Sequence, residues 1–72
     1  MVEYTHHAER RMVRRGISKA DVEFCLENHH ISLEEKEGCM LFIANHPNGK
    51  RIQVVLDTTV TPNKVVTAIW LD

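Results

Sequence analysis

One stretch near the N-terminus carries most of the side chains that could do chemistry. Its imidazole and guanidinium groups recur at intervals of three and four residues, at His7, Arg10, Arg11, Arg14 and Arg15. At about 100° per residue of helix, His7, Arg11 and Arg15 fall on one face, one turn apart. Guanidinium groups grip phosphate with paired hydrogen bonds, and imidazole readily exchanges a proton near neutral pH. The stretch therefore offers the groups that binding or cleaving a phosphodiester backbone would need.

The same stretch predicts the helix that positions these groups. Thr5 is a good N-cap, and Gly16 is the residue type that most often ends a helix in the left-handed conformation. Ala8, Met12 and Val13 fall on the side opposite the imidazole and guanidinium face, where we expect them to contact the core. One helix thus carries an apolar seam on one side and a cationic face on the opposite side.

A second helix is predicted immediately after the first. Ser18 is its N-cap, and Asp21 takes the position of the acidic partner in a capping box. Ile17 before the cap and Val22 after it suit a hydrophobic staple. The helical pattern fades at Asn28, so the chain begins with a helix, a tight turn and a helix.

The remainder of the chain alternates with the period of β-strands. Strands are predicted near 31–34, 39–44, 50–57 and 64–71, and Asn48-Gly49 is a strong hairpin dipeptide between the second and third. The second strand is apolar at every position, so we expect it to be central and covered by the helices. The sequence predicts an α+β fold, one domain over 1–72, with two N-terminal helices packed on a four-stranded antiparallel β-meander.

Charge is divided unevenly along the chain. Residues 1–20 contain five basic and two acidic side chains, whereas 21–37 contain six acidic and one basic, and the net charge is −1. Any anion-binding surface must therefore be local, centred on the first helix, with help from Lys50, Arg51 and Lys64. The longest apolar run, 39–44, is much shorter than a membrane span, and the N-terminus lacks a signal-peptide core. We expect a cytoplasmic protein with no membrane partner.

Simpler interpretations of the same residues stay open. The arginine face could be a solvated helix surface that forms salt bridges to the acidic second helix, and His7 could be an ordinary surface residue near a helix start. Cys25 and Cys39 form no C-x-x-C motif and are expected to be reduced. The histidines lack metal-ligand spacing with a clear third ligand, so we expect no metal and no cofactor.

The pattern His-Ala-x-x-Arg-Met-x-x-Arg-Gly-Ile-Ser, which runs from His7 to Ser18, resembles a known signature. It is similar to a small family of unknown function placed among the RelE-like toxins, within the barnase–EndoU–colicin–RelE fold group. The run 65–70 resembles that family's closing strand. The resemblance implies a RelE-like fold and a metal-independent endoribonuclease that acts on RNA, such as ribosome-associated mRNA. It also implies a toxin with an antitoxin protein as partner.

The resemblance also implies roles for single residues. His7 would be the base or acid, and Arg11 and Arg15 would hold the phosphate and stabilise its extra charge. Substrate contacts would come from a second set of residues, provided that those on the sheet face the helix: Arg14, Lys50, Arg51 and Thr67. Thr67 could equally be a β-branched strand former.

A hypothesis of another class uses the same face without catalysis. The uneven charge favours an interaction module whose basic helix binds an acidic partner segment or the acidic helix of a second copy, as a homodimer. Salt-sensitive association that leaves RNA intact would distinguish this module from a nuclease.

Overall fold

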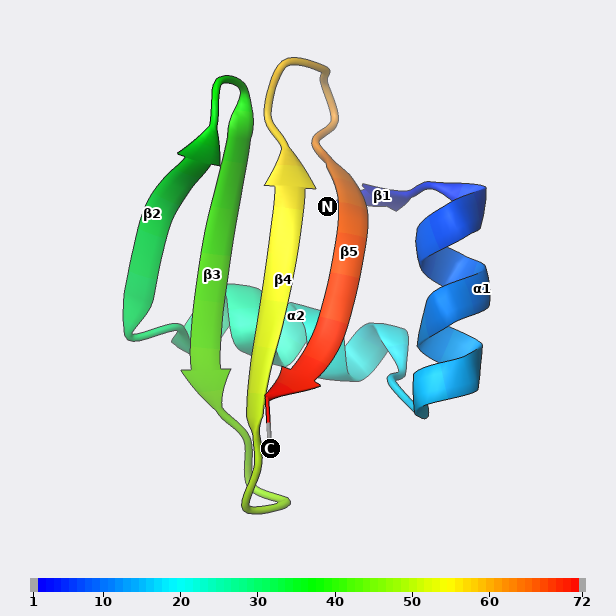
Figure 1. The fold of residues 1–72 in the computed structure, drawn as a ribbon, viewed down its shortest axis with the longest axis vertical. Helices are drawn as coiled ribbons and strands as arrows, with labels where there is room; N and C mark the ends of the chain where they lie inside the picture. The colour runs from blue at the N-terminus through cyan, green and yellow to red at the C-terminus, as the bar shows by residue number, and fades with distance from the viewer. Residues whose placement is uncertain (1, 72) are drawn as a thin grey trace.

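The computed structural model describes residues 2–71, which form two helices and a five-stranded mixed sheet. Figure 1 shows the order of these elements. In chain order they are β1 (Glu3–Tyr4), α1 (His6–Arg15), α2 (Lys19–Asn28), β2 (Ile31–Lys36), β3 (Cys39–Asn45), β4 (Arg51–Asp57) and β5 (Lys64–Leu71). The α+β class is confirmed. No helix within residues 2–71 is both long and apolar enough to cross a membrane.

The predicted ends of α1 and the predicted start of α2 are confirmed. The Thr5 hydroxyl accepts a hydrogen bond from the Ala8 N–H at 3.0 Å, and Gly16 ends α1 with a φ of 68°. The left-handed conformation at Gly16 turns the chain sharply into the next helix. The Ser18 hydroxyl and the Asp21 carboxylate each accept the other's backbone N–H, which completes the capping box. Chemistry between near neighbours therefore sets the corner between the helices.

The sheet differs from the predicted meander. Its strand order is β1-β5-β4-β3-β2, and the four long strands pair antiparallel as neighbours. However, β1 adds a fifth strand, parallel to β5, with Glu3 opposite Lys64 and Tyr4 opposite Val65. The prediction of four purely antiparallel strands is wrong because two residues are too few to show an alternating pattern. Their pairing depends on a strand at the other end of the chain.

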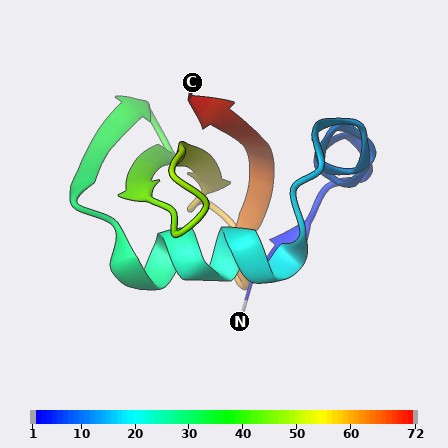
Figure 2. The ribbon, with the colours of Figure 1, turned by 90° about the horizontal axis from the view of Figure 1, so that it is seen from below.

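The two helices pack on the sheet in different places: α2 covers one face at β3 and β4, and α1 packs against β5. The core between them and the sheet consists of Ala8, Met12, Ile17, Val22, Cys25, Ala44, Ile52, Val54, Leu56, Val65 and Ala68. Seen end-on in Figure 2, α2 crosses one side of the sheet and α1 lies beyond the β5 edge. As predicted, β3 lies inside the sheet and is covered by a helix, but that helix is α2 alone, because α1 contacts β5 instead.

Val13 also departs from the prediction for α1. Its side chain is 82% exposed, whereas Met12 beside it is 3% exposed. The two side chains point about 100° apart around the helix, and the covered arc of α1 is too narrow to include both. Val13 thus leaves the predicted apolar seam and becomes an exposed apolar residue on the helix surface.

Candidate functional site

Three arginines of α1 line an open hollow of about 400 Å³ on the surface: Arg11, Arg14 and Arg15. All three are exposed, and every residue that lines the hollow is cationic. Guanidinium groups at this spacing can each direct several N–H donors toward one anion. The hollow is therefore suited to a phosphate or another anion with several acceptor oxygens.

The helix itself brings these side chains together. Arg11 and Arg15 are one turn apart on the same side of α1, and Arg14 lies on the next row. Because α1 ends at Gly16, Arg14 and Arg15 lie in its last turn, where the negative end of the helix dipole favours cations. The dipole offsets part of the repulsion among the three charges.

Arg15 is held against the edge of the sheet by contacts at both ends of the residue. Its Nη1 donates a hydrogen bond to the Ala68 carbonyl at 3.0 Å, and its own carbonyl accepts from Trp70 Nε1 at 3.0 Å. Strand β1 pairs with β5 only at Lys64 and Val65. The Ala68 carbonyl lies farther along that edge of β5, where β1 does not reach, and it accepts its hydrogen bond from the Arg15 guanidinium. A guanidinium has five N–H donors, so Arg15 keeps most of them for a ligand.

Lys50 lies on the same side of the protein as Arg15. Its Nζ lies 5.9 Å from the centroid of the Trp70 ring, and the same tryptophan donates to Arg15. Trp70 thus connects the β3–β4 hairpin to the end of α1. The sequence pattern did not assign Trp70 this connecting role, because its partners lie far away along the chain.

The other predicted residues are not grouped with the hollow. His7 is exposed on α1 but is not among the residues that line it. Arg51 and Thr67 occupy positions that alternate with buried Ile52 and Ala68. They therefore point to the sheet face that the helices do not cover. The condition that these sheet residues face the helix is not met for Arg51 and Thr67.

A contact between Asp21 and His46 was missed by the sequence reasoning. Asn48 donates its backbone N–H to His46 Nδ1 at 3.1 Å, so Nε2 carries the proton and donates to Asp21 Oδ1 at 2.8 Å. The imidazole also meets the edges of Phe24 and Trp70, with ring centroids 5.3 and 5.1 Å away. This cluster fastens the hairpin to the start of α2, and no spacing rule relates positions so far apart.

The pKa of Asp21 reflects this environment. Burial acts to raise it, but hydrogen bonds from the Ser18 backbone and the side chains of His46 and Ser18 outweigh burial, so the pKa lies below its ordinary value of 3.8. Asp21 is thus an anion that caps a helix and binds an imidazole. It takes no part in the arginine hollow.

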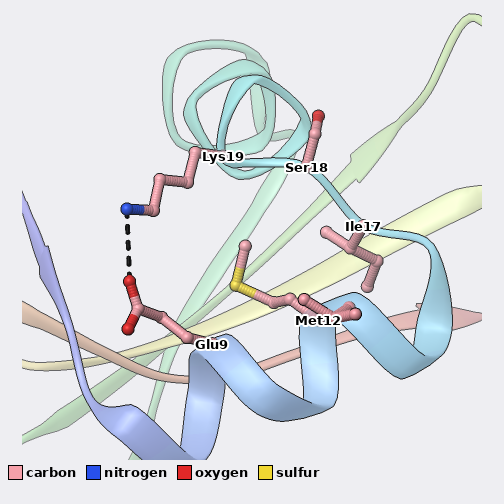
Figure 3. A pocket seen from close by; sticks show the side chains of 6 residues that line it. Glu9, Met12, Ile17, Ser18 and Lys19 are labelled. Atoms are coloured by element: carbon pink, nitrogen blue, oxygen red, sulfur yellow. Dashed lines mark ion pairs between the residues drawn. The ribbon is translucent and has the colours of Figure 1, made fainter.

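A second hollow, of about 390 Å³, lies where α1 meets the start of α2: it is lined by Glu9, Met12, Val13, Ile17, Ser18 and Lys19. In Figure 3 the Met12 and Ile17 side chains lie close together beside the ion pair of Lys19 Nζ with Glu9 Oε2, which is 3.2 Å long. The hollow is mainly apolar, so it is suited to accommodating an apolar side chain rather than to catalysis. Across residues 2–71, no three His, Cys, Asp or Glu side chains are grouped to hold a metal ion.

A comparison with protein families gives one match. The model of a family described as "Domain of unknown function (DUF4258)" matches residues 4–70. No curated protein and no solved structure matches the chain. The family description names no activity, and nothing in these comparisons links the chain to RelE-like toxins.

Proposed function

Because the chain belongs to the DUF4258 family, whose function is unknown, we propose a function from the arginine hollow. The protein binds the phosphates of RNA there and acts as a metal-independent endoribonuclease of the RelE-like toxin type. The observation that carries this proposal is the grouping of Arg11, Arg14 and Arg15 around one open hollow. Three cations held together repel one another, and a bound polyanion relieves that repulsion.

The proposed reaction uses the ribose 2′-hydroxyl as the nucleophile. Its oxygen attacks the adjacent phosphorus, His7 takes the hydroxyl proton, and the 5′-oxygen leaves with a proton from solvent. The products are a 2′,3′-cyclic phosphate and a free 5′-hydroxyl. Arg11 and Arg15 stabilise the extra negative charge on the phosphorane. His7 lies one turn before Arg11, about 6 Å along the helix axis, so the substrate must extend across that turn.

Supporting contacts come from the same side of the molecule. Arg14 lines the hollow, and Lys50 reaches the side of the protein where Trp70 holds the end of α1. We leave Arg51 and Thr67 out of the proposed contacts because they point to the opposite face of the sheet. In this proposal an antitoxin protein would neutralise the toxin by covering the hollow.

The test is cleavage of single-stranded RNA by purified protein in the presence of EDTA, with and without ribosomes. Wild type is compared with Arg11→Ala and His7→Ala. Arg10→Ala is the matched control, because Arg10 is an arginine of the same helix that does not line the hollow. Cleavage that ends in cyclic phosphate and is lost in the first two variants alone supports the proposal. Intact RNA in every reaction, or equal loss in the control, overturns it.

A second candidate function is a non-catalytic interaction module, and the mainly apolar hollow beside α1 favours it. Val13 is 82% exposed there, next to the cationic surface of the same helix. This arrangement suits an acidic partner segment with one apolar anchor. For a homodimer through the same basic face, sedimentation at low and high salt is the test: association that high salt abolishes, with RNA left intact, supports the module.

A further inference from the structure

The indole of Trp70 lies beside the arginine hollow, which is lined by Arg11, Arg14 and Arg15. Trp70 Nε1 donates to the Arg15 carbonyl at 3.0 Å, and the Arg15 guanidinium donates to the Ala68 carbonyl at 3.0 Å. Ala68 comes two residues before Trp70 in β5, and two residues of a strand span about 7 Å. The indole and a guanidinium of the hollow are thus separated by no more than one nucleotide can bridge.

Contacts on several sides hold the Trp70 ring in one orientation. The hydrogen bond from Nε1 to Arg15 fixes one edge of the indole. The His46 imidazole stands at 86° to the indole, with the ring centroids 5.1 Å apart, and this imidazole is itself bound to Asp21. Trp70 also packs against the buried core. Because the ring is already ordered, a flat ligand that stacks on it costs little conformational freedom.

Part of the indole is nevertheless open to solvent. Trp70 is only partly buried, and the exposed Lys50 places its Nζ over the ring, 5.9 Å from the centroid. An exposed lysine reaches an indole in this way only where that side of the ring is accessible. The lysine stem is flexible, so its ammonium group can move from the ring to a neighbouring phosphate when a base takes its place.

We propose that Trp70 stacks an unpaired base of the RNA whose phosphate occupies the arginine hollow, so that the site selects single-stranded over double-stranded RNA. This inference rests on the proposed function, because it requires RNA phosphates in the hollow, but it does not require cleavage. Aromatic side chains receive bases that are free to leave a helical stack. In a duplex the neighbouring base pairs cover both faces of each base, so the indole finds no partner.

The charges around Trp70 suit this ligand. Cations approach the indole from two elements, Arg15 from α1 and Lys50 from the β3–β4 hairpin, which Figure 1 shows at the same end of the molecule. Cations that follow the backbone beside a ring that receives a base are typical of sites for single-stranded nucleic acid. The carboxylate linked to this cluster, Asp21, is engaged in hydrogen bonds with His46 and Ser18.

Trp70 can report its own stacking, because it is the single tryptophan of the chain. The probe is a short single-stranded oligonucleotide of 2′-O-methyl ribose, which cannot be cleaved because the attacking hydroxyl is blocked. Its controls are an abasic oligonucleotide of the same length and a duplex of the same 2′-O-methyl sequence. We expect the single-stranded probe to quench Trp70 fluorescence, and both controls to leave it nearly unchanged although they carry the same phosphates.

Two variants separate stacking from the support that Trp70 gives to α1. Trp70→Phe and Trp70→Leu both lose the hydrogen bond to Arg15 and keep an apolar side chain, but only phenylalanine keeps an aromatic face. By fluorescence anisotropy of a labelled probe, Trp70→Leu should bind at least about 5-fold more weakly than Trp70→Phe. Both variants should bind the abasic oligonucleotide equally. Far-UV circular dichroism checks their folding, and the quenching experiment on wild type needs no variant.

The outcomes distinguish this inference from the proposed function. Binding of the probe without quenching, quenching by the abasic oligonucleotide or the duplex as strong as that by the probe, or equal affinity of the two folded variants overturns the stacking and leaves phosphate binding in place. Quenching by the probe together with RNA that stays uncleaved supports the stacking and removes the endoribonuclease. If no oligonucleotide binds, both proposals are overturned.

Discussion

Replacing Arg11 with alanine should change the salt dependence of RNA binding by a predictable amount. Each phosphate that a cation neutralises on a single strand contributes a slope of about −0.7 to the logarithm of affinity against the logarithm of salt concentration. The hollow is lined by Arg11, Arg14 and Arg15. If each neutralises one phosphate, the wild-type slope is about −2.1.

This slope predicts how strongly the affinity for RNA falls as the salt concentration rises. Between about 50 and about 200 mM salt, wild-type affinity should fall about 18-fold. Arg11→Ala leaves two contacts, so its slope should be about −1.4 and its affinity should fall about 7-fold over the same range. Fluorescence anisotropy of a labelled single-stranded RNA, titrated with protein at several salt concentrations, measures both slopes.

The control is Arg10→Ala, which removes a charge from the same helix but leaves the hollow intact. Its slope should match that of wild type. A wild-type slope near zero would refute the reasoning, because the hollow would then bind no phosphate. A change as large in Arg10→Ala as in Arg11→Ala would also refute it, because the effect would then depend on the charge of the helix and not on the hollow.

Three further outcomes concern the fold. Met12→Ala should lower the free energy of unfolding by about 2–4 kcal/mol, whereas Val13→Ala should change it by less than about 0.5 kcal/mol; urea titration measures both, and equal effects would contradict the packing. Burial raises the pKa of the Cys25 thiol to about 11, so iodoacetamide should modify Cys39 in the folded protein and reach Cys25 only after denaturant is added, as followed by mass spectrometry. The folded pKa of Asp21 is lowered from 3.8, so its stabilisation is complete above that value and is lost as the pH falls through the lower folded pKa. Thermal unfolding across the acid range should therefore show a smaller loss of stability in Asp21→Asn than in wild type, and identical curves would contradict this assignment.

Features that depend on residues close together in the sequence were predicted correctly. The caps at Thr5 and Ser18 and the end of α1 at Gly16 involve groups within a few residues of one another. The helical period also placed Arg11 and Arg15 on one side of α1, and both line the hollow. The roles of these arginines in binding or catalysis stay predictions.

A helical wheel was less informative about burial. It gave the angle between Met12 and Val13 correctly but not the width of the arc that the rest of the protein covers. That width depends on where β5 and the start of α2 lie, and it left Val13 exposed. The angular position of a residue is local, whereas its burial depends on neighbours from elsewhere in the chain.

The order of helices and strands, the helix caps and the cationic helix follow from residue types and short-range spacing. Tertiary structure alone decided that β1 pairs with β5, that Trp70 holds the end of α1, and that α2 alone covers β3. The physical reason is that these contacts join residues far apart along the chain, where no periodic pattern records the partner. A strand that is apolar on both sides has the same pattern whether a helix, a second copy or water meets its second face.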